Sequence, residues 1–165
     1  METNLAEAYR QSRRNFIANC HRAGADAIAR VHPVKGPDGR PLFCDSAAFG
    51  PRDAGRALLL IEEDGTASRL VGRDLALPPG TRLVVVHALD PFARAWGRPG
   101  EPWDWPQKTL AAIAGEDLSR VKALAVAGGE TEALNAALVS ALPETAITFL
   151  GSADQAAVSA AIAAL

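Results

Sequence analysis

The hydrophobic pattern at the start of the chain changes from helical to strand-like. From Asn4 to Ala23 apolar residues recur at helical spacing, and Gly24 follows where a helix would end. The short segments Ala27–Pro33 and Phe43–Phe49 lie on either side of a Gly-Pro-Asp-Gly turn sequence at 36–39. The pattern therefore predicts one amphipathic helix followed by an antiparallel hairpin.

Two later segments are continuous apolar runs rather than alternating ones. Ala57–Ile61 and Arg82–Ala88 are rich in Leu and Val, which is typical of strands covered on both faces by helices. We expect them to be adjacent and parallel in the middle of a sheet. Further elements are then predicted as a helix at Gln107–Ala114, a strand at Lys122–Ala127, a helix at Glu130–Leu142, a strand at Ala146–Leu150 and a helix at Ala153–Ala164. This alternation predicts an α/β fold, a three-layer sandwich with a mixed, largely parallel central sheet.

The length and composition fit one domain. The 165 residues are 48% hydrophobic with a mean hydropathy of +0.04, enough for a sizeable core. We expect a single domain over 1–165, with the helix and hairpin in 1–56 and the alternating core in 57–165. No apolar run suggests a signal peptide or a membrane span, and Cys20 and Cys44 lie in no paired motif. These features predict reduced thiols, a cytoplasmic location and no membrane partner.

The charge balance argues against nucleic acid as a partner. The chain has 17 Lys and Arg against 19 Asp and Glu, a formal net charge of −2. Binding to phosphates needs clustered, uncompensated basic side chains. We therefore expect a protein partner or self-association.

An acidic segment follows the first central strand. Glu62, Glu63 and Asp64 come directly after that strand, and Asp90 lies just past the second. Ligands of open α/β sheets gather at this edge, and carboxylates suit Mg²⁺ or Ca²⁺ better than zinc. The simpler interpretation, which we favour, is a solvated acidic turn.

The three histidines are dispersed. His21 falls on the predicted first helix, while His32 and His87 fall at strand ends, and no two are spaced as metal ligands. A partly buried, hydrogen-bonded role is the better interpretation of His87, because it follows three consecutive valines.

All three tryptophans of the chain lie in one loop together with two arginines. The residues are Arg94, Trp96, Arg98, Trp103 and Trp105. Exposed Trp and Arg are strong anchors of protein interfaces. Packing of the loop onto the sheet is the alternative.

Several phrases between residues 9 and 96 carry a family resemblance. They are Tyr9-Arg10-Gln11-Ser12-Arg13-Arg14-Asn15-Phe16, Gly36-Pro37-Asp38-Gly39-Arg40-Pro41-Leu42 with Asp45, Gly50-Pro51-Arg52-Asp53-Ala54, and Val86-His87-Ala88-Leu89-Asp90-Pro91-Phe92. Together they resemble a bacterial family of unknown function that has the zinc carboxypeptidase fold and is related to the aspartoacylase-like deacylases. The last phrase is similar to V-H-A-L-N-P-Y in that family.

The resemblance does not extend to the residues that would bind zinc. The family motif H-G-x-E-G should follow the strand at 58–61, where this chain has Glu62-Glu63-Asp64-Gly65. The D-x-H-T-G segment with the third ligand would match Ala125–Gly129, which has no histidine, and Phe149 lies at or beside the expected general base. An N-x-D-x-N-R-N segment is also missing. The resemblance therefore implies a shortened relative without the zinc site.

These observations predict a non-catalytic, carboxypeptidase-like scaffold, a pseudoenzyme without cofactor that serves as a binding or assembly module. The loop at 94–105 would be its partner-binding surface, with a homodimer as the simplest assembly. The alternative is a divalent-cation-dependent hydrolase with a replaced acidic site at Glu62, Glu63, Asp64 and Asp90.

Overall fold

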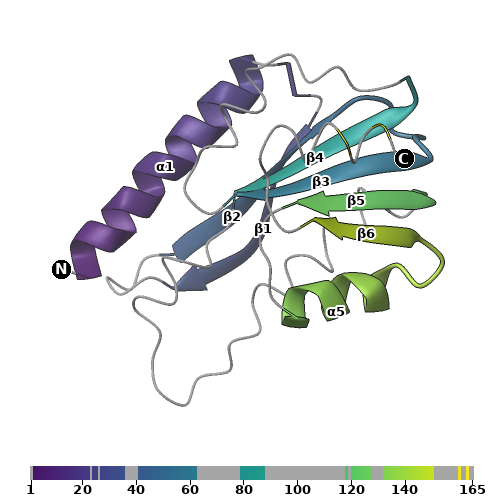
Figure 1. The fold of residues 1–165 in the computed structure, drawn as a ribbon. Helices are drawn as coiled ribbons and strands as arrows, with labels where there is room; N and C mark the ends of the chain where they lie inside the picture. Colours follow the sequence, from purple (N-terminus) through teal and green to yellow (C-terminus); the bar gives the residue numbers. More distant parts are fainter. Residues whose placement is uncertain are drawn as a thin grey trace.

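A six-stranded sheet with helices on both faces makes up the described part of the chain. The computed structural model describes residues 2–22, 24–25, 27–35, 41–62, 79–87, 118, 120–127, 132–150, 160 and 163. The elements are α1 (Glu2–Arg22), β1 (Ala27–Lys35), β2 (Pro41–Phe49), β3 (Arg56–Glu62), β4 (Thr81–His87), β5 (Ala123–Ala127), α5 (Glu132–Ala141) and β6 (Ala146–Leu150). The strand order is β1-β2-β4-β3-β5-β6 (Figure 1).

Helix α1 begins two residues before the predicted start and ends at Arg22, two residues before the predicted glycine, Gly24. Gly24 has a φ of +87°, a conformation that side chains with a Cβ rarely adopt. Its N–H donates to the carbonyl of His21, and the N–H of Ala25 donates to the carbonyl of Cys20, both at 3.0 Å. This pair of bonds is a Schellman motif, which satisfies the last carbonyls of the helix.

The predicted hairpin is confirmed by antiparallel pairing of β1 with β2. Val31 pairs with Cys44 and Val34 with Leu42, so two residues of β1, His32 and Pro33, lie opposite one residue of β2. This arrangement is a β-bulge, and it places the proline where the ladder is already interrupted.

The predicted neighbours β3 and β4 are parallel and lie in the middle of the sheet, as expected. Strand β4 is buried along its whole length. It pairs on its other side with β2, in the antiparallel sense, while β5 and β6 extend the parallel part beyond β3. The α/β fold with a mixed, largely parallel sheet is confirmed.

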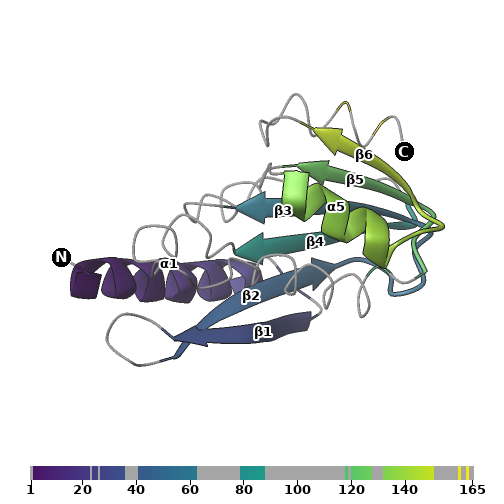
Figure 2. The ribbon, with the colours of Figure 1, turned by 90° about the horizontal axis from the view of Figure 1, so that it is seen from below.

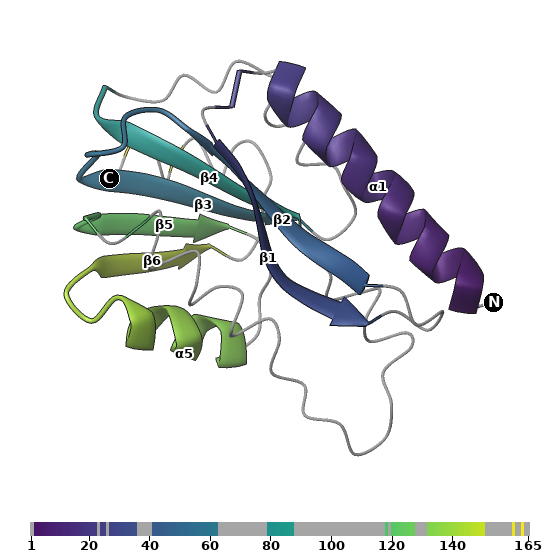
Figure 3. The ribbon, with the colours of Figure 1, turned by 180° about the vertical axis from the view of Figure 1, so that it is seen from behind.

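Alternation along the central strands divides the core between the two faces of the sheet. Leu58 and Leu60 pack with Phe16 and Cys20 of α1. On the other face, Leu59 belongs to the cluster that contains Leu138 and Leu142, which lie on α5 and just after it. Figures 2 and 3 show α1 and α5 on opposite sides of the sheet. These are the three layers that the apolar runs predicted.

A glycine turn holds the start of β4 against the end of β2. Gly50 has a φ of +92°, and a Cβ at this position would lie 2.7 Å from the carbonyl oxygen of Thr81. Arg82, buried at the start of β4, donates from Nη1 to the carbonyl of Gly50 at 2.9 Å. This contact helps to set the register between the two strands.

Some sequence predictions concern residues outside those that the structure describes. These are the helix at 107–114 and nearly all of the helix at 153–164, of which Ala160 and Ala163 are described and helical. Among the described helices, none is long and apolar enough to cross a membrane.

Candidate functional site

The acidic positions predicted from sequence are described only in part. Glu62 is the last residue of β3, and the parallel register places it opposite His87 of β4. Glu63, Asp64 and Asp90 lie outside the described residues, as do Arg94, Trp96, Arg98, Trp103 and Trp105. Within the described ranges, no group of three or more His, Cys, Asp and Glu side chains could hold a metal ion.

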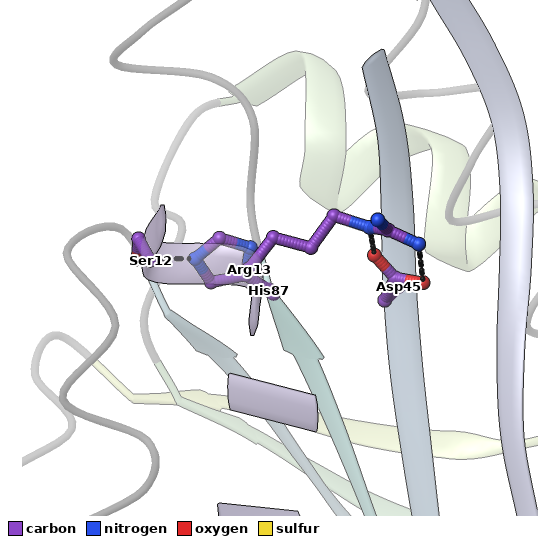
Figure 4. Close-up of polar contacts among 4 residues, drawn as sticks. All are labelled: Ser12, Arg13, Asp45 and His87. Carbon is purple, nitrogen blue, oxygen red and sulfur yellow. Dashed lines mark hydrogen bonds and ion pairs between the residues drawn. The ribbon is translucent and has the colours of Figure 1, made fainter. Parts of the chain in front are cut away.

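The structure instead brings together four polar side chains from α1, β2 and β4. Asp45 of β2 and His87 of β4 are register partners, and both are fully buried. Each is two residues from a member of the core beneath α1, Ala47 and Val85 respectively. Since side chains two apart in a strand share a face, Asp45 and His87 both face α1. With Ser12 and Arg13 of the helix, they form what we call the helix–sheet cluster (Figure 4).

The first half of the cluster is an ion pair. The guanidinium of Arg13 donates from Nε to Oδ2 of Asp45 and from Nη2 to Oδ1, the latter at 3.3 Å. The Asp45 side chain is 1% exposed and that of Arg13 is 17% exposed. A two-pronged bond of this kind fixes both position and orientation, and it compensates the buried carboxylate.

The second half of the cluster is a hydrogen bond between Ser12 and His87. Ser12 Oγ lies 2.8 Å from Nε2 of His87. The imidazole also stacks on the ring of Phe16, with centroids 5.2 Å apart and an interplanar angle of 27°. Because Ser12 and Phe16 are four residues apart, they lie on one stripe of α1 and contact the same histidine. The predicted hydrogen bond of His87 is confirmed, and the side chain is fully rather than partly buried.

Burial decides the charge state of His87. It lowers the pKa of the imidazole from 6.5 to about 4, and the neighbouring positive charge of Arg13 acts in the same direction. His87 is therefore neutral at pH 7. Burial likewise raises the pKa of the Cys20 thiol to about 11, so this buried free cysteine stays a protonated thiol at pH 7.

The three histidines of this chain are not placed as ligands of one catalytic zinc. Such a zinc takes about three protein ligands and leaves one position open. His21 follows Ser12 by nine residues, about 13 Å along the helix axis. His32 lies on β1, which β2 separates from β4 by about 10 Å. His87 is fully buried and hydrogen-bonded to Ser12. The three imidazoles cannot meet at one ion.

The helix–sheet cluster was missed by reasoning from chemical motifs, although a signal was present. Each of its members occurs in one of the phrases that carry the family resemblance: Ser12, Arg13, Asp45 and His87. Membership in these phrases is the signal that could have indicated the cluster. The spacing along the chain gives no indication of which residues pair.

The geometry defines an α/β protein whose N-terminal helix is bound through polar contacts over the carboxyl end of a central strand. The chain belongs to the family described as a protein of unknown function (DUF2817), whose model matches residues 5–101. That range contains all the phrases of the resemblance. No curated protein matches the sequence.

Solved structures with similar folds come from distant proteins. Porphyromonas gingivalis glutaminyl cyclase matches at 12% identity over 95% of this chain and 86% of its own, with a TM-score of 0.49. Macrostomum lignano glutaminyl cyclase matches at 12% identity, 93% and 71% coverage, and a TM-score of 0.48. Legionella pneumophila LapA aminopeptidase matches at 9% identity, with 95% and 50% coverage and a TM-score of 0.40.

Proposed function

We propose that this protein is a non-catalytic relative of zinc carboxypeptidase-like enzymes, a cytoplasmic pseudoenzyme that acts as a binding or assembly module. The sequence supports the proposal because the chain has Glu62-Glu63-Asp64-Gly65 where the resembled family has H-G-x-E-G.

The observation that carries the proposal is the set of contacts that His87 makes. This residue ends a central parallel strand, at the edge where ligands of α/β sheets usually bind. Its imidazole is bonded to Ser12, stacked on Phe16 and kept neutral by burial. Together with the Arg13–Asp45 pair, it binds a helix in place of a substrate. The polar groups available at this position support a structural role.

The proposed binding surface is the loop at 94–105. Its tryptophans would bury rigid aromatic area at low entropic cost, and its arginines could bond carboxylates in two-pronged geometry. The simplest partner is a second copy of the chain, since a twofold contact needs one surface only.

The proposal predicts that the purified protein carries no stoichiometric zinc and does not hydrolyse peptides or N-acyl amino acids. The reason is the shortage of imidazole ligands. Elemental analysis and assays with and without added zinc test this. One tightly bound zinc per chain, removed by a chelator together with an activity, contradicts the proposal.

A cation-dependent hydrolase is the second candidate, because Glu62 stands at the carboxyl end of β3 with Glu63 and Asp64 after it. If these carboxylates and Asp90 converge, Ca²⁺ or Mg²⁺ relieves their repulsion and raises the melting temperature. We expect no shift at millimolar concentrations. A shift that Glu63→Gln abolishes would favour the hydrolase.

The binding role predicts that Trp103→Ala and Arg98→Ala each weaken self-association or a partner complex by more than about 1 kcal/mol. The far-ultraviolet circular dichroism of both variants should equal that of the wild type. Sedimentation equilibrium measures the change in the association constant. If Trp103→Ala unfolds the domain and the wild type is monomeric, the tryptophan serves packing and the loop is not the interface.

A further inference from the structure

The two outer strands of the sheet differ in how their sequences protect an open edge. β6, Ala146–Leu150, is the last strand in the order and pairs with β5 among the described strands. It contains no charge and no proline, and three of its five residues, Ile147, Thr148 and Phe149, favour strands. Such a segment readily pairs with another strand through its backbone.

The opposite edge has features that prevent pairing of this kind. β1 carries Pro33, which lacks an N–H, and the bulge at that point interrupts the ladder. Arg30 and Lys35 add positive charge to the strand. Proline, a bulge and charge are the usual means of keeping an edge strand from pairing. β6 has none of these features.

We propose that β6 pairs with β6 of a second copy of this chain, antiparallel about a twofold axis at Thr148, to form one continuous sheet. This inference rests on the proposed assembly role, keeps a second copy of the chain as the partner, and assigns a contact in addition to the loop at 94–105. The axis places Thr148 opposite itself, Ala146 opposite Leu150, and Ile147 opposite Phe149. In a twofold contact a side chain on the axis faces its own copy. A strand without charged side chains therefore avoids like-charge repulsion there.

The surroundings of β6 agree with this arrangement. Ala146 and Thr148 are exposed, whereas Ile147 and Phe149 are partly buried against the core beneath α5. The exposed positions of α5 include Ala136, Val139 and Ser140, and Val139 is 52% exposed. None of these side chains carries a charge that would repel its copy. Backbone pairing would supply the affinity, and the matched side chains would set the register.

The test uses opposite charges at the axis. Thr148→Lys places two ammonium groups opposite each other in the dimer, and Thr148→Glu places two carboxylates there. Juxtaposed like charges should raise the dimer dissociation constant tenfold or more. An equimolar mixture of the two variants pairs opposite charges and should restore the dimer. Ala18→Lys adds the same charge to an exposed position of α1 and should leave the dimer unchanged.

Analytical ultracentrifugation of wild type, variants and mixture measures these constants. We expect a concentration-dependent wild-type dimer, two monomeric variants and a dimeric mixture. A wild type that stays monomeric at the highest attainable concentration overturns the inference, as does a mixture that fails to pair. If Trp103→Ala dissociates the dimer and Thr148→Lys does not, the β6 inference fails while the proposed function stands. Zinc-dependent hydrolysis by the wild type would overturn the proposed function instead.

Discussion

Asp45→Ala should destabilise the protein by about 3 kcal/mol, at the lower end of the range for breaking a buried ion pair. The substitution leaves the guanidinium of Arg13 at the helix–sheet boundary without its carboxylate partner. Arg13 is 17% exposed, and water can therefore compensate part of the loss. Urea denaturation at pH 7 measures the change in the free energy of unfolding.

The control for this prediction is Asp53→Ala, which removes an exposed carboxylate in the turn after β2. It should change stability by less than about 0.5 kcal/mol. The double variant Arg13→Met with Asp45→Leu replaces the ion pair by apolar groups of similar size and should recover most of the loss. Equal effects of Asp45→Ala and Asp53→Ala would show that the Arg13–Asp45 pair contributes little.

Acidification from pH 6.5 to pH 4 should cost the protein about 3 kcal/mol through His87 alone. The pKa of this histidine is about 4 in the folded protein and 6.5 ordinarily, so the unfolded chain binds the proton more tightly in this interval. The stabilisation is complete above pH 6.5 and is lost as the pH falls toward 4. Below pH 4 both states are protonated, and this group causes no further loss.

His87→Gln removes the titrating group while keeping a polar side chain near Ser12. Its free energy of unfolding, lower than that of the wild type at pH 7, should fall less steeply between pH 6.5 and 4. His21→Gln removes an exposed imidazole of α1 and should retain the wild-type slope. The ring protons of His87 should titrate near pH 4 in nuclear magnetic resonance spectra. A midpoint near 6.5, or a slope in His87→Gln equal to the wild type, would contradict the prediction.

The central strands could be predicted because their signal is local. Leu58 to Leu60 and Val84 to Val86 are apolar at every position, a pattern typical of a strand between two layers of helices. Right-handed crossover connections then favour parallel neighbours. The end of α1 was equally local, since Gly24 supplies a conformation that closes the helix.

The helix–sheet cluster could not be predicted in the same way. Ser12 and His87 are 75 residues apart, and Arg13 and Asp45 are 32 apart. Hydrophobic periodicity identifies buried positions by their apolar side chains, so it predicts that Arg13 and Asp45 face solvent. The acidic positions from Glu63 onward and the tryptophan loop stay predictions, because they lie outside the described residues.

The sequence by itself determined the hairpin, the central strands and the end of α1, because side-chain period and residue identity are properties of neighbouring positions. Only the tertiary structure decided what His87 and Asp45 do. The register between β2 and β4 places these two residues side by side, and α1 packs over the face of the sheet that they share. Burial then makes His87 neutral and requires a cation for Asp45. These effects depend on distances between residues in space, which cannot be predicted from their separation along the chain.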